Sequence, residues 1–290
     1  MLYRKKKWKI YYLLLPVLLF FSIIYLYPII SSFVISFYKY DPLDKTHPFM
    51  GLKNYVNLFK NEAFITSLKN TAIFCIFNVG IGLPIALFLA WLFNKILRFA
   101  KIYRTVYFIP VVTSLVVCAL IWGWIYQPSK AGLLNFILEK IFGIGPFLWL
   151  QDKKLALPSI IAMSIWKTLG FRMVIFSAGL QSIPDTYYEA SKVDGAKWYN
   201  DLFNITIPLL KPTILFVLVT SLIASSKVFA EIFVMTEGGP LNATRTIVFH
   251  IYEEGFFYWN MGKASAAAFI MFIIVAIITI FQLKILRFDR

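Results

Sequence analysis

Cysteine, histidine and acidic residues are all scarce in this chain. Its 290 residues include two cysteines, two histidines and 14 Asp and Glu residues, against 29 Lys and Arg residues. Cys75 and Cys118 fall inside apolar runs, and His47 and His250 have no cysteine or histidine neighbour at ligand spacing. The sequence therefore predicts neither a disulfide framework nor a metal site.

Motifs of hydrolytic enzymes are also missing. The nearest remnant of the phosphate-binding loop G-x-x-x-x-G-K-S/T is Gly262-Lys263, where Phe257 stands at the first glycine position and Ala264 at the last. No Gly-x-Ser-x-Gly elbow and no His-Glu-x-x-His helix occurs. We therefore expect no ATP hydrolysis, no catalytic residue and no bound cofactor in this chain.

Apolar residues, in contrast, are in excess. They make up 60% of the chain, with a mean hydropathy of +0.73, whereas soluble domains contain about 45–50%. A net charge of +15 can indicate a nucleic-acid partner. Here, however, the basic residues flank apolar runs, and no compact domain of adequate size lies outside those runs. The composition therefore indicates an integral membrane protein and no nucleic-acid partner.

Six apolar segments are long enough to cross a bilayer, which takes about 20 residues in a helix. Two of them carry charges: the fourth contains Lys167 and Arg172, and the fifth contains Lys227 and Glu231. Because lipid offers no partner to unpaired backbone groups, we expect six helices and an all-α membrane protein. The predicted spans are 10–38, 70–94, 105–127, 155–181, 212–235 and 264–286.

Basic residues next to these spans predict the orientation of the chain. By the positive-inside rule, both termini lie in the cytoplasm. We expect the first span to stay uncleaved after a basic segment 1–9, since its uncharged run is too long for a signal peptide. The first outer loop also contains five lysines, so the excess of basic residues on the inner side depends on the segments nearest the first three spans. The basic residues of the inner segments are Arg4, Lys5, Lys6, Lys7, Lys9, Lys95, Arg98, Lys101, Arg104, Lys284, Arg287 and Arg290.

A polar loop between the fourth and fifth spans is expected on the cytoplasmic side. Thr186 and Glu189 have the spacing of a capping box, which predicts a short amphipathic helix over 187–196. Gly195 permits a sharp reversal of the chain, and a second short helix is predicted over 198–203. Such a helix–glycine–helix unit is a compact lever that can dock into another subunit and transmit its motion to the next span.

The same loop, residues 182–211, resembles the EAA motif of the permease subunits of ABC importers, Glu-Ala-Ala-x3-Gly-x9-Ile-x-Leu-Pro. Every spacing matches, with Ser191 in place of the second alanine and Ile207 in place of the leucine. The similarity extends over roughly residues 10–285 and is greatest to the carbohydrate branch, which includes maltose, glycerol-3-phosphate and oligosaccharide permeases. Other similar segments are Gly51-Leu52-Lys53-Asn54-Tyr55, Gly179-Leu180-Gln181-Ser182-Ile183-Pro184 and Thr236-Glu237-Gly238-Gly239-Pro240.

The resemblance implies a type I ABC importer in a bacterial cytoplasmic membrane, taking up a sugar or related polyol. A second homologous permease, two ATPase subunits that bind ATP-Mg, and an extracytoplasmic substrate-binding protein are the implied partners. The loop would dock in a cleft of an ATPase subunit, with Glu189 as the ion-pair partner of a basic residue. The residues implied in coupling are Glu189, Ala190, Ser191, Asp194, Gly195, Ile205 and Pro208.

Charges inside the fourth and fifth spans need a partner or a water-filled cavity, because each costs about 2.5–3.5 kcal/mol at the bilayer centre. Lys227 and Glu231 lie on one face of a continuous helix, where they can pair. Arg172 is expected near the inner boundary, where it can snorkel. By resemblance, the two spans line the substrate cavity; contact with the partner permease is the other interpretation. The cavity candidates are Ser164, Lys167, Thr168, Phe171, Ser225, Ser226, Lys227 and Glu231.

Two other classes of membrane protein stay open at this point. An ion-coupled secondary transporter would use intramembrane charges such as Lys227 and Glu231, often within inverted repeats. An integral-membrane enzyme would need clustered His, Asp or Cys residues. The sequence shows no repeat and no such cluster, and the docking loop favours the ATP-driven importer.

Overall fold

The computed structural model describes residues 2–95 and 100–287, so Arg98 and Arg290 of the predicted inner segments lie outside the described residues. All regular elements in this part of the chain are helices, which confirms the all-α prediction. They are α1 (Leu2–Phe21), η1 (Ser22–Leu26), α2 (Tyr27–Ile35), α3 (Lys53–Lys60), α4 (Glu62–Lys95), α5 (Ala100–Val112), α6 (Leu115–Ile125), α7 (Leu133–Phe142), α8 (Ala156–Gln181), α9 (Asp185–Val193), α10 (Trp198–Asn200), η2 (Asp201–Thr206), α11 (Ile207–Leu209), α12 (Lys211–Ser226), α13 (Ala230–Met235), α14 (Ile247–Tyr252), η3 (Glu253–Phe257) and α15 (Met261–Arg287).

Four helical segments within the described ranges are long and apolar enough to cross a membrane: 11–35, 62–94, 156–181 and 261–284. Two bent pairs also pass the same test. They are 105–112 with 115–125, bent by 106°, and 198–209 with 211–226, bent by 71°. The count reaches the predicted six if each bent pair is one span.

The fifth predicted span, 212–235, is not one continuous helix. Helix α12 ends at Ser226, with Lys227 as its C-cap, and the short helix α13 starts at Ala230. Lys227 and Glu231 therefore do not share the face of a continuous helix, and that part of the prediction is wrong. The helix break moves the two side chains into different surroundings, described below.

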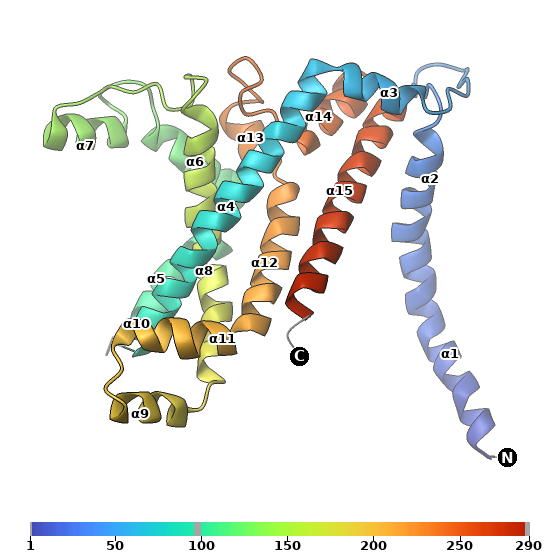
Figure 1. Cartoon of the computed structure of the whole chain (residues 1–290). Helices are drawn as coiled ribbons and strands as arrows, with labels where there is room; N and C mark the ends of the chain where they lie inside the picture. Colours follow the sequence, from blue (N-terminus) through green and yellow to red (C-terminus); the bar gives the residue numbers. More distant parts are fainter. Residues whose placement is uncertain (1, 96–99, 288–290) are drawn as a thin grey trace. The chain divides into compact units, whose positions relative to one another are not determined.

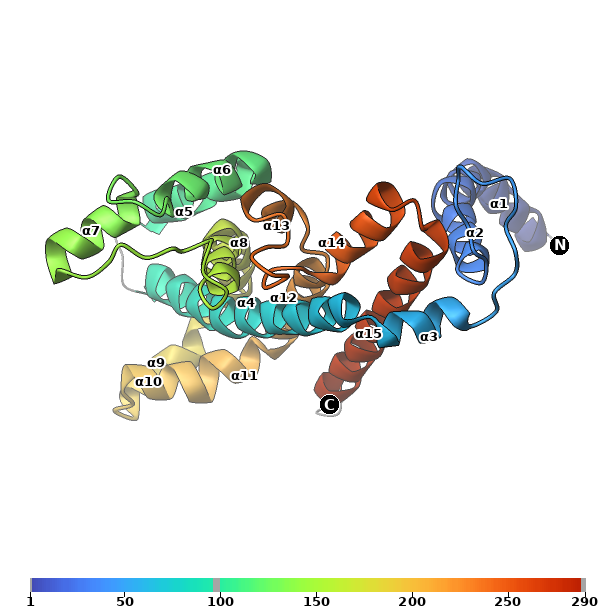
Figure 2. The ribbon, with the colours of Figure 1, turned by 90° about the horizontal axis from the view of Figure 1, so that it is seen from above.

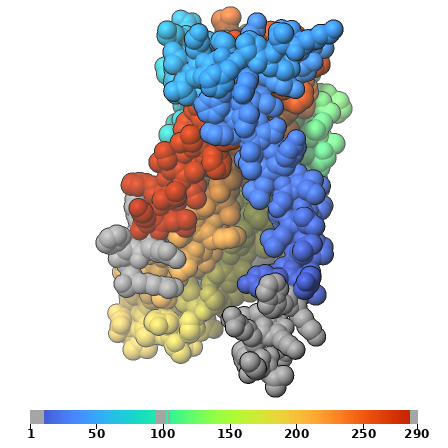
Figure 3. Space-filling view, turned by 90° about the vertical axis from the view of Figure 1, so that its right-hand side faces the viewer, coloured from blue at the N-terminus to red at the C-terminus, as the bar shows by residue number. Residues whose placement is uncertain are grey.

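The chain divides into two compact units. The first comprises residues 1–62 and 250–272, and residues 36–60 form its upper end in Figure 3. There the Asn54 amide donates to the carbonyls of Ser36 and Tyr38 at 2.8 and 2.9 Å. The Tyr55 hydroxyl lies 2.7 Å from the Ser36 hydroxyl. The Gly51–Tyr55 segment singled out in the sequence therefore fixes the end of α2.

The second unit comprises residues 63–249 and 273–290 and contains both hydrophobic cores of the described chain. One core surrounds Met173 and Phe176 of α8 and includes Trp91 of α4. The other contains Phe74 of α4 and Ile160 of α8. Helix α8 therefore runs through both cores, and it connects the polar loop to the centre of the unit (Figure 1).

Candidate functional site

Helix α9 starts the loop that resembles the EAA motif. Its N-cap is Pro184, with φ −59° and ψ 136°, and no side chain caps it. The capping box of Thr186 and Glu189 is therefore wrong, because the helix begins at Asp185 and Thr186 is already inside its first turn. The backbone of Pro184 and the carboxylate of Asp185 at the positive end of the helix account for the earlier start. Glu189 is thus left exposed on the helix surface.

The reversal after α9 occurs at Gly195, as predicted. Its φ of +72° lies in the left-handed region, which glycine adopts without a steric penalty. The second helical segment runs from Trp198 to Leu209, further than the predicted end at Phe203, and includes α10, η2 and α11. The 71° bend then leads into α12. We call residues 185–209 the lever.

Two hydrogen bonds join the two halves of the lever, which lie side by side in Figures 1 and 2. Ser191 Oγ donates to Asp201 Oδ1 at 2.5 Å, and the hydroxyls of Tyr188 and Thr206 lie 3.0 Å apart. Asp201 and Thr206 are both buried. The serine that departs from the EAA pattern at Ser191 therefore supplies a bond to a buried carboxylate that alanine could not make.

The lever is also packed against the ends of α8 and α12. Leu202 and Leu210 belong to the same core as Leu180 and Ile183. A Cβ added to Gly179 would lie 2.8 Å from Leu210 Cδ2 and 2.7 Å from the Thr213 hydroxyl, so these helices approach closely because position 179 has no side chain. The lever, the end of α8 and the start of α12 are therefore packed into one core.

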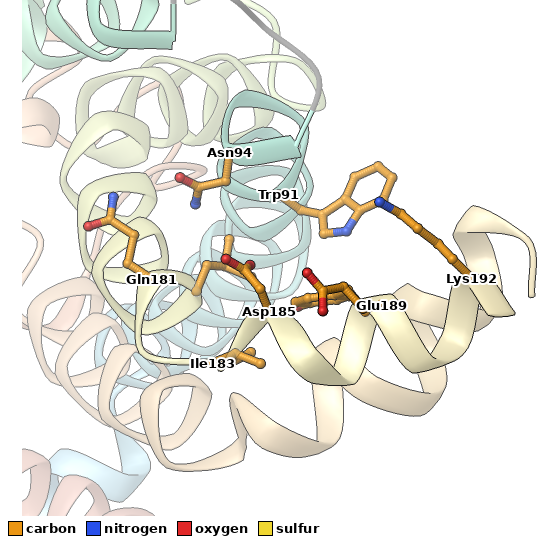
Figure 4. A pocket seen from close by; sticks show the side chains of 9 residues that line it. Trp91, Asn94, Gln181, Ile183, Asp185, Glu189 and Lys192 are labelled. Atoms are coloured by element: carbon orange, nitrogen blue, oxygen red, sulfur yellow. The ribbon is translucent and has the colours of Figure 1, made fainter.

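A pocket of about 440 Å³ opens between α9 and the ends of α4 and α8 (Figure 4). Asp185 and Glu189, one helical turn apart, are exposed in it and have no hydrogen bond or ion pair to any described residue. Two exposed carboxylates suit a cationic group, and a guanidinium best, since its planar set of donors can bond to carboxylate oxygens. The lining residues are Trp91, Asn94, Leu180, Gln181, Ile183, Asp185, Tyr188, Glu189 and Lys192.

The remaining coupling candidates lie around the same lever. Ala190 and Asp194 are exposed on or next to α9, and Pro208 is exposed in α11, while Ile205 is half-buried in η2. The structure therefore brings the predicted coupling residues together in one surface element. Asp185, Trp91 and Asn94 were not among the predicted residues, and only the proximity of α4 to α9 in the fold identifies them.

Lys167 of α8 forms hydrogen bonds with the end of α5, in the broken third span. Its Nζ donates to the carbonyls of Pro110 and Val111 at 2.6 and 3.0 Å. These are among the last carbonyls of α5, where no intrahelical donor is available and a positive charge is favourable. Lys167 thus caps α5 next to the break that separates it from α6.

Glu231 belongs to the same polar cluster. It is 8% exposed and lies near the side chains of Ser164 and Lys167. The hydroxyl of Thr168 donates to the Ser164 carbonyl at 2.9 Å. Lys227, in contrast, is exposed at the end of α12. We call Ser164, Lys167 and Glu231 the lysine cluster.

Arg172 is buried, which makes the prediction that it snorkels to the inner boundary wrong. It is 3% exposed, and its guanidinium donates to the Asn78 carbonyl at 2.9 Å and to Asn78 Oδ1 at 2.5 Å. Ser225 Oγ donates to the same Oδ1 at 3.3 Å. A Cβ at Gly82 would overlap Arg172 Nη1. No local spacing pairs Arg172 with Asn78, which lies 94 residues earlier, although an asparagine in an uncharged span indicates a buried polar contact.

Two further cavity candidates lie at the edges of this arrangement. The Ser226 hydroxyl donates to the Leu222 carbonyl at 2.8 Å and lies 3.5 Å from Cys75 Sγ. Phe171 is 51% exposed. Of the eight candidates, five lie in the lysine cluster or next to Asn78 and Cys75: Ser164, Lys167, Glu231, Ser225 and Ser226. Thr168 bonds within its own helix. Phe171 and Lys227 are exposed.

The chain was compared with known proteins. Residues 82–287 match the family described as binding-protein-dependent transport system inner membrane component. The arabinooligosaccharides transport system permease protein AraP of Bacillus subtilis (strain 168) is 32% identical over 286 residues, covering 98% of this chain and 90% of that protein. The sn-glycerol-3-phosphate transport system permease protein UgpA of Yersinia pestis bv. Antiqua (strain Antiqua) is 33% identical, covering 96% and 93%.

A solved structure is similar over nearly the whole length. It is a crystal structure of a bacterial ABC transporter involved in the import of the acidic polysaccharide alginate. One of its chains superposes with a TM-score of 0.87 at 28% identity, covering 99% of this chain and 98% of that one. The match confirms the type I importer architecture predicted from the sequence.

Proposed function

The chain belongs to the family of binding-protein-dependent transport system inner membrane components, and on that premise we propose that it is one of two membrane-spanning subunits of an ABC importer for a sugar or related polyol. The names of its relatives, which include permeases for arabinooligosaccharides and for sn-glycerol-3-phosphate, support the substrate class. They support the ATP-driven importer and not the ion-coupled secondary transporter. No chemical change of the substrate is involved.

Energy comes from separate ATPase subunits, which bind ATP-Mg and dock on the lever. The observation that carries this assignment is the lever itself, an exposed helix with two carboxylates on its surface and a second helix packed against α8 and α12. Asp185 and Glu189 accept a basic side chain of the ATPase. Closure of the ATPase dimer on ATP moves the lever, and the differential affinity of ATP for the two states shifts the permease between them.

The complete transporter contains a second, homologous permease, two ATPase subunits and an extracytoplasmic binding protein, and the termini of this chain are cytoplasmic. The family description, which names dependence on a binding protein, supports that partner. The candidate cavity residues divide into two roles. Phe171 and Lys227, both exposed, face the translocation path or the second permease, whereas Lys167 and Arg172 hold the helices that form its wall.

Reconstitution tests the proposal. A tag on this chain is expected to copurify a second permease and an ATPase. Liposomes that contain the assembly are expected to take up radiolabelled oligosaccharide only with internal ATP and external binding protein. Uptake by this chain alone, driven by an ion gradient without ATP, would show that the function is that of a secondary transporter.

A further inference from the structure

The second unit has another pocket, of about 420 Å³, at the opposite end from the lever, near α6 and α13 in the upper part of Figure 1. Its walls come from the end of α6, the segment just before α8 and the turn that follows α13. Tyr126, Gln127, Gln151 and Thr236 supply its polar side chains. We call it the glutamine pocket. Its volume falls within the range of about 300–1,000 Å³ that is typical of ligand sites.

The chemistry of this pocket is polar but uncharged. Among the described residues, its lining includes no Lys, Arg, Asp or Glu. The side-chain amides of Gln127 and Gln151 are exposed and form no hydrogen bond with any described residue. Each amide offers two donors and one acceptor, which matches the mixed donor and acceptor character of sugar hydroxyl groups. Leu150 and Met235 provide apolar surface beside them.

The walls of the glutamine pocket are held in place by hydrogen bonds and ring contacts. The Tyr126 hydroxyl donates to the Ser159 carbonyl at 3.0 Å, and its ring lies 5.9 Å from that of Trp149. Trp149 Nε1 in turn donates to Asn135 Oδ1 at 2.9 Å. On the other side, the Thr244 hydroxyl donates to the Gly239 carbonyl at 2.7 Å. A site whose walls are already ordered loses little entropy when a ligand binds.

We propose that the glutamine pocket binds one uncharged glycosyl unit of the transported carbohydrate, with Gln127 and Gln151 bonded to its hydroxyl groups. The inference rests on the proposed function and narrows its substrate class. Sites for phosphate or carboxylate groups use Arg, Lys or similar charge-assisted donors. Their absence from the described lining disfavours anions such as sn-glycerol 3-phosphate and acidic polysaccharides, which the names of two similar proteins mention.

Cysteine protection in the assembled transporter tests this site. Gln127→Cys and Gln151→Cys are made separately and alkylated with N-ethylmaleimide; the native Cys75 and Cys118 are buried and give little background. Arabinotriose or maltotriose, at several times its dissociation constant, is expected to slow alkylation about fivefold. Adding Gln127→Ala to the Gln151→Cys chain is expected to remove this protection. The matched control is Asn57→Cys, an exposed amide on α3, whose alkylation no sugar slows.

The outcomes separate this site from the function of the whole chain. Equal or stronger protection by sn-glycerol 3-phosphate or by an alginate trisaccharide overturns the uncharged site. Absence of protection by both neutral trisaccharides, with ATP-driven oligosaccharide uptake intact in the unsubstituted transporter, overturns the pocket assignment and leaves the importer standing. Failure of ATP-driven uptake in the unsubstituted transporter counts against the proposed function itself.

Discussion

Replacement of Lys167 by methionine removes the ammonium group through which the lysine cluster contacts the end of α5 in the broken third span. Lys167 Nζ donates to the carbonyls of Pro110 and Val111 and interacts with Glu231, which is 8% exposed. Methionine has a similar length but neither charge nor donor. Lys167→Met therefore removes the donor to two carbonyls at the end of α5 and the positive charge beside a buried carboxylate.

The expected cost follows from the burial of the cluster. A hydrogen bond from a charged donor contributes about 1.5–3 kcal/mol, and Lys167 donates two such bonds to carbonyls of α5. A chain of about 250 residues loses about 2 °C of Tm per kcal/mol, so Lys167→Met is expected to lower the Tm by about 3 °C or more. Adding Glu231→Gln removes the uncompensated carboxylate and is expected to recover about 1–3 kcal/mol.

Thermal unfolding of the purified chain in detergent measures this double-mutant cycle. Lys227→Met is the control, since Lys227 is exposed and makes no ion pair with any described residue. Its effect is expected to stay within about 0.5 kcal/mol. Strictly additive effects of Lys167→Met and Glu231→Gln would refute the coupling, and so would a Lys227→Met variant as unstable as Lys167→Met.

Three further substitutions test the lever and the buried arginine. Glu189→Ala, at an exposed position, is expected to leave the Tm unchanged but to lower ATP-driven uptake at least about tenfold. A tenfold change corresponds to a loss of about 1.4 kcal/mol of interaction free energy. Undiminished uptake would contradict the docking role. Gly195→Ala places a Cβ at φ +72° with no atom within 4 Å, so only the backbone penalty of about 1–2 kcal/mol applies. This variant is expected to lower uptake. Gly195→Asn is expected to restore part of the loss, since asparagine tolerates positive φ better than alanine does. Gly82→Ala forces Arg172 to move and is expected to lower the Tm, whereas Gly80→Ala, with open space around its Cβ in the same helix, is expected to leave it equal or higher; equal losses for the two would rule out the contact with Arg172.

Much of the lever could be predicted from the sequence because its signals are local. A glycine after a polar amphipathic segment indicates a reversal, and the structure has Gly195 at positive φ. Pro184-Asp185-Thr186 indicated the start of α9, but the capping-box pattern of Thr186 and Glu189 placed the cap at Thr186, whereas Pro184 is the N-cap. Length and apolarity alone also indicated most spans. The bend in the third span and the break after Ser226 in the fifth left no comparable signal in hydropathy, which does not register a break of a few residues.

The partners of the buried charges could not be predicted, since they lie far away along the chain. Asn78 is 94 residues before Arg172, and Pro110 is 57 residues before Lys167. The spacing of Lys227 and Glu231 suggested a local pair, and this would have required α12 to continue past Ser226. A rule based on i and i+4 holds only where the helix is intact. Tertiary contacts, here those of α4 and α5 with α8, decide where each charge is satisfied.

These polar contacts determine how motion of the lever reaches the membrane. Arg172 on α8, Asn78 on α4 and Ser225 on α12 are bonded to one another where solvent does not reach. Separating the guanidinium from Asn78 would break hydrogen bonds of a buried charged group, at about 1.5–3 kcal/mol each. Such a cost is several times the thermal energy, so we expect α4, α8 and α12 to move together, along with the lever packed on the ends of α8 and α12. Relative motion within the unit is expected instead at the break between α5 and α6, where the chain bends by 106°.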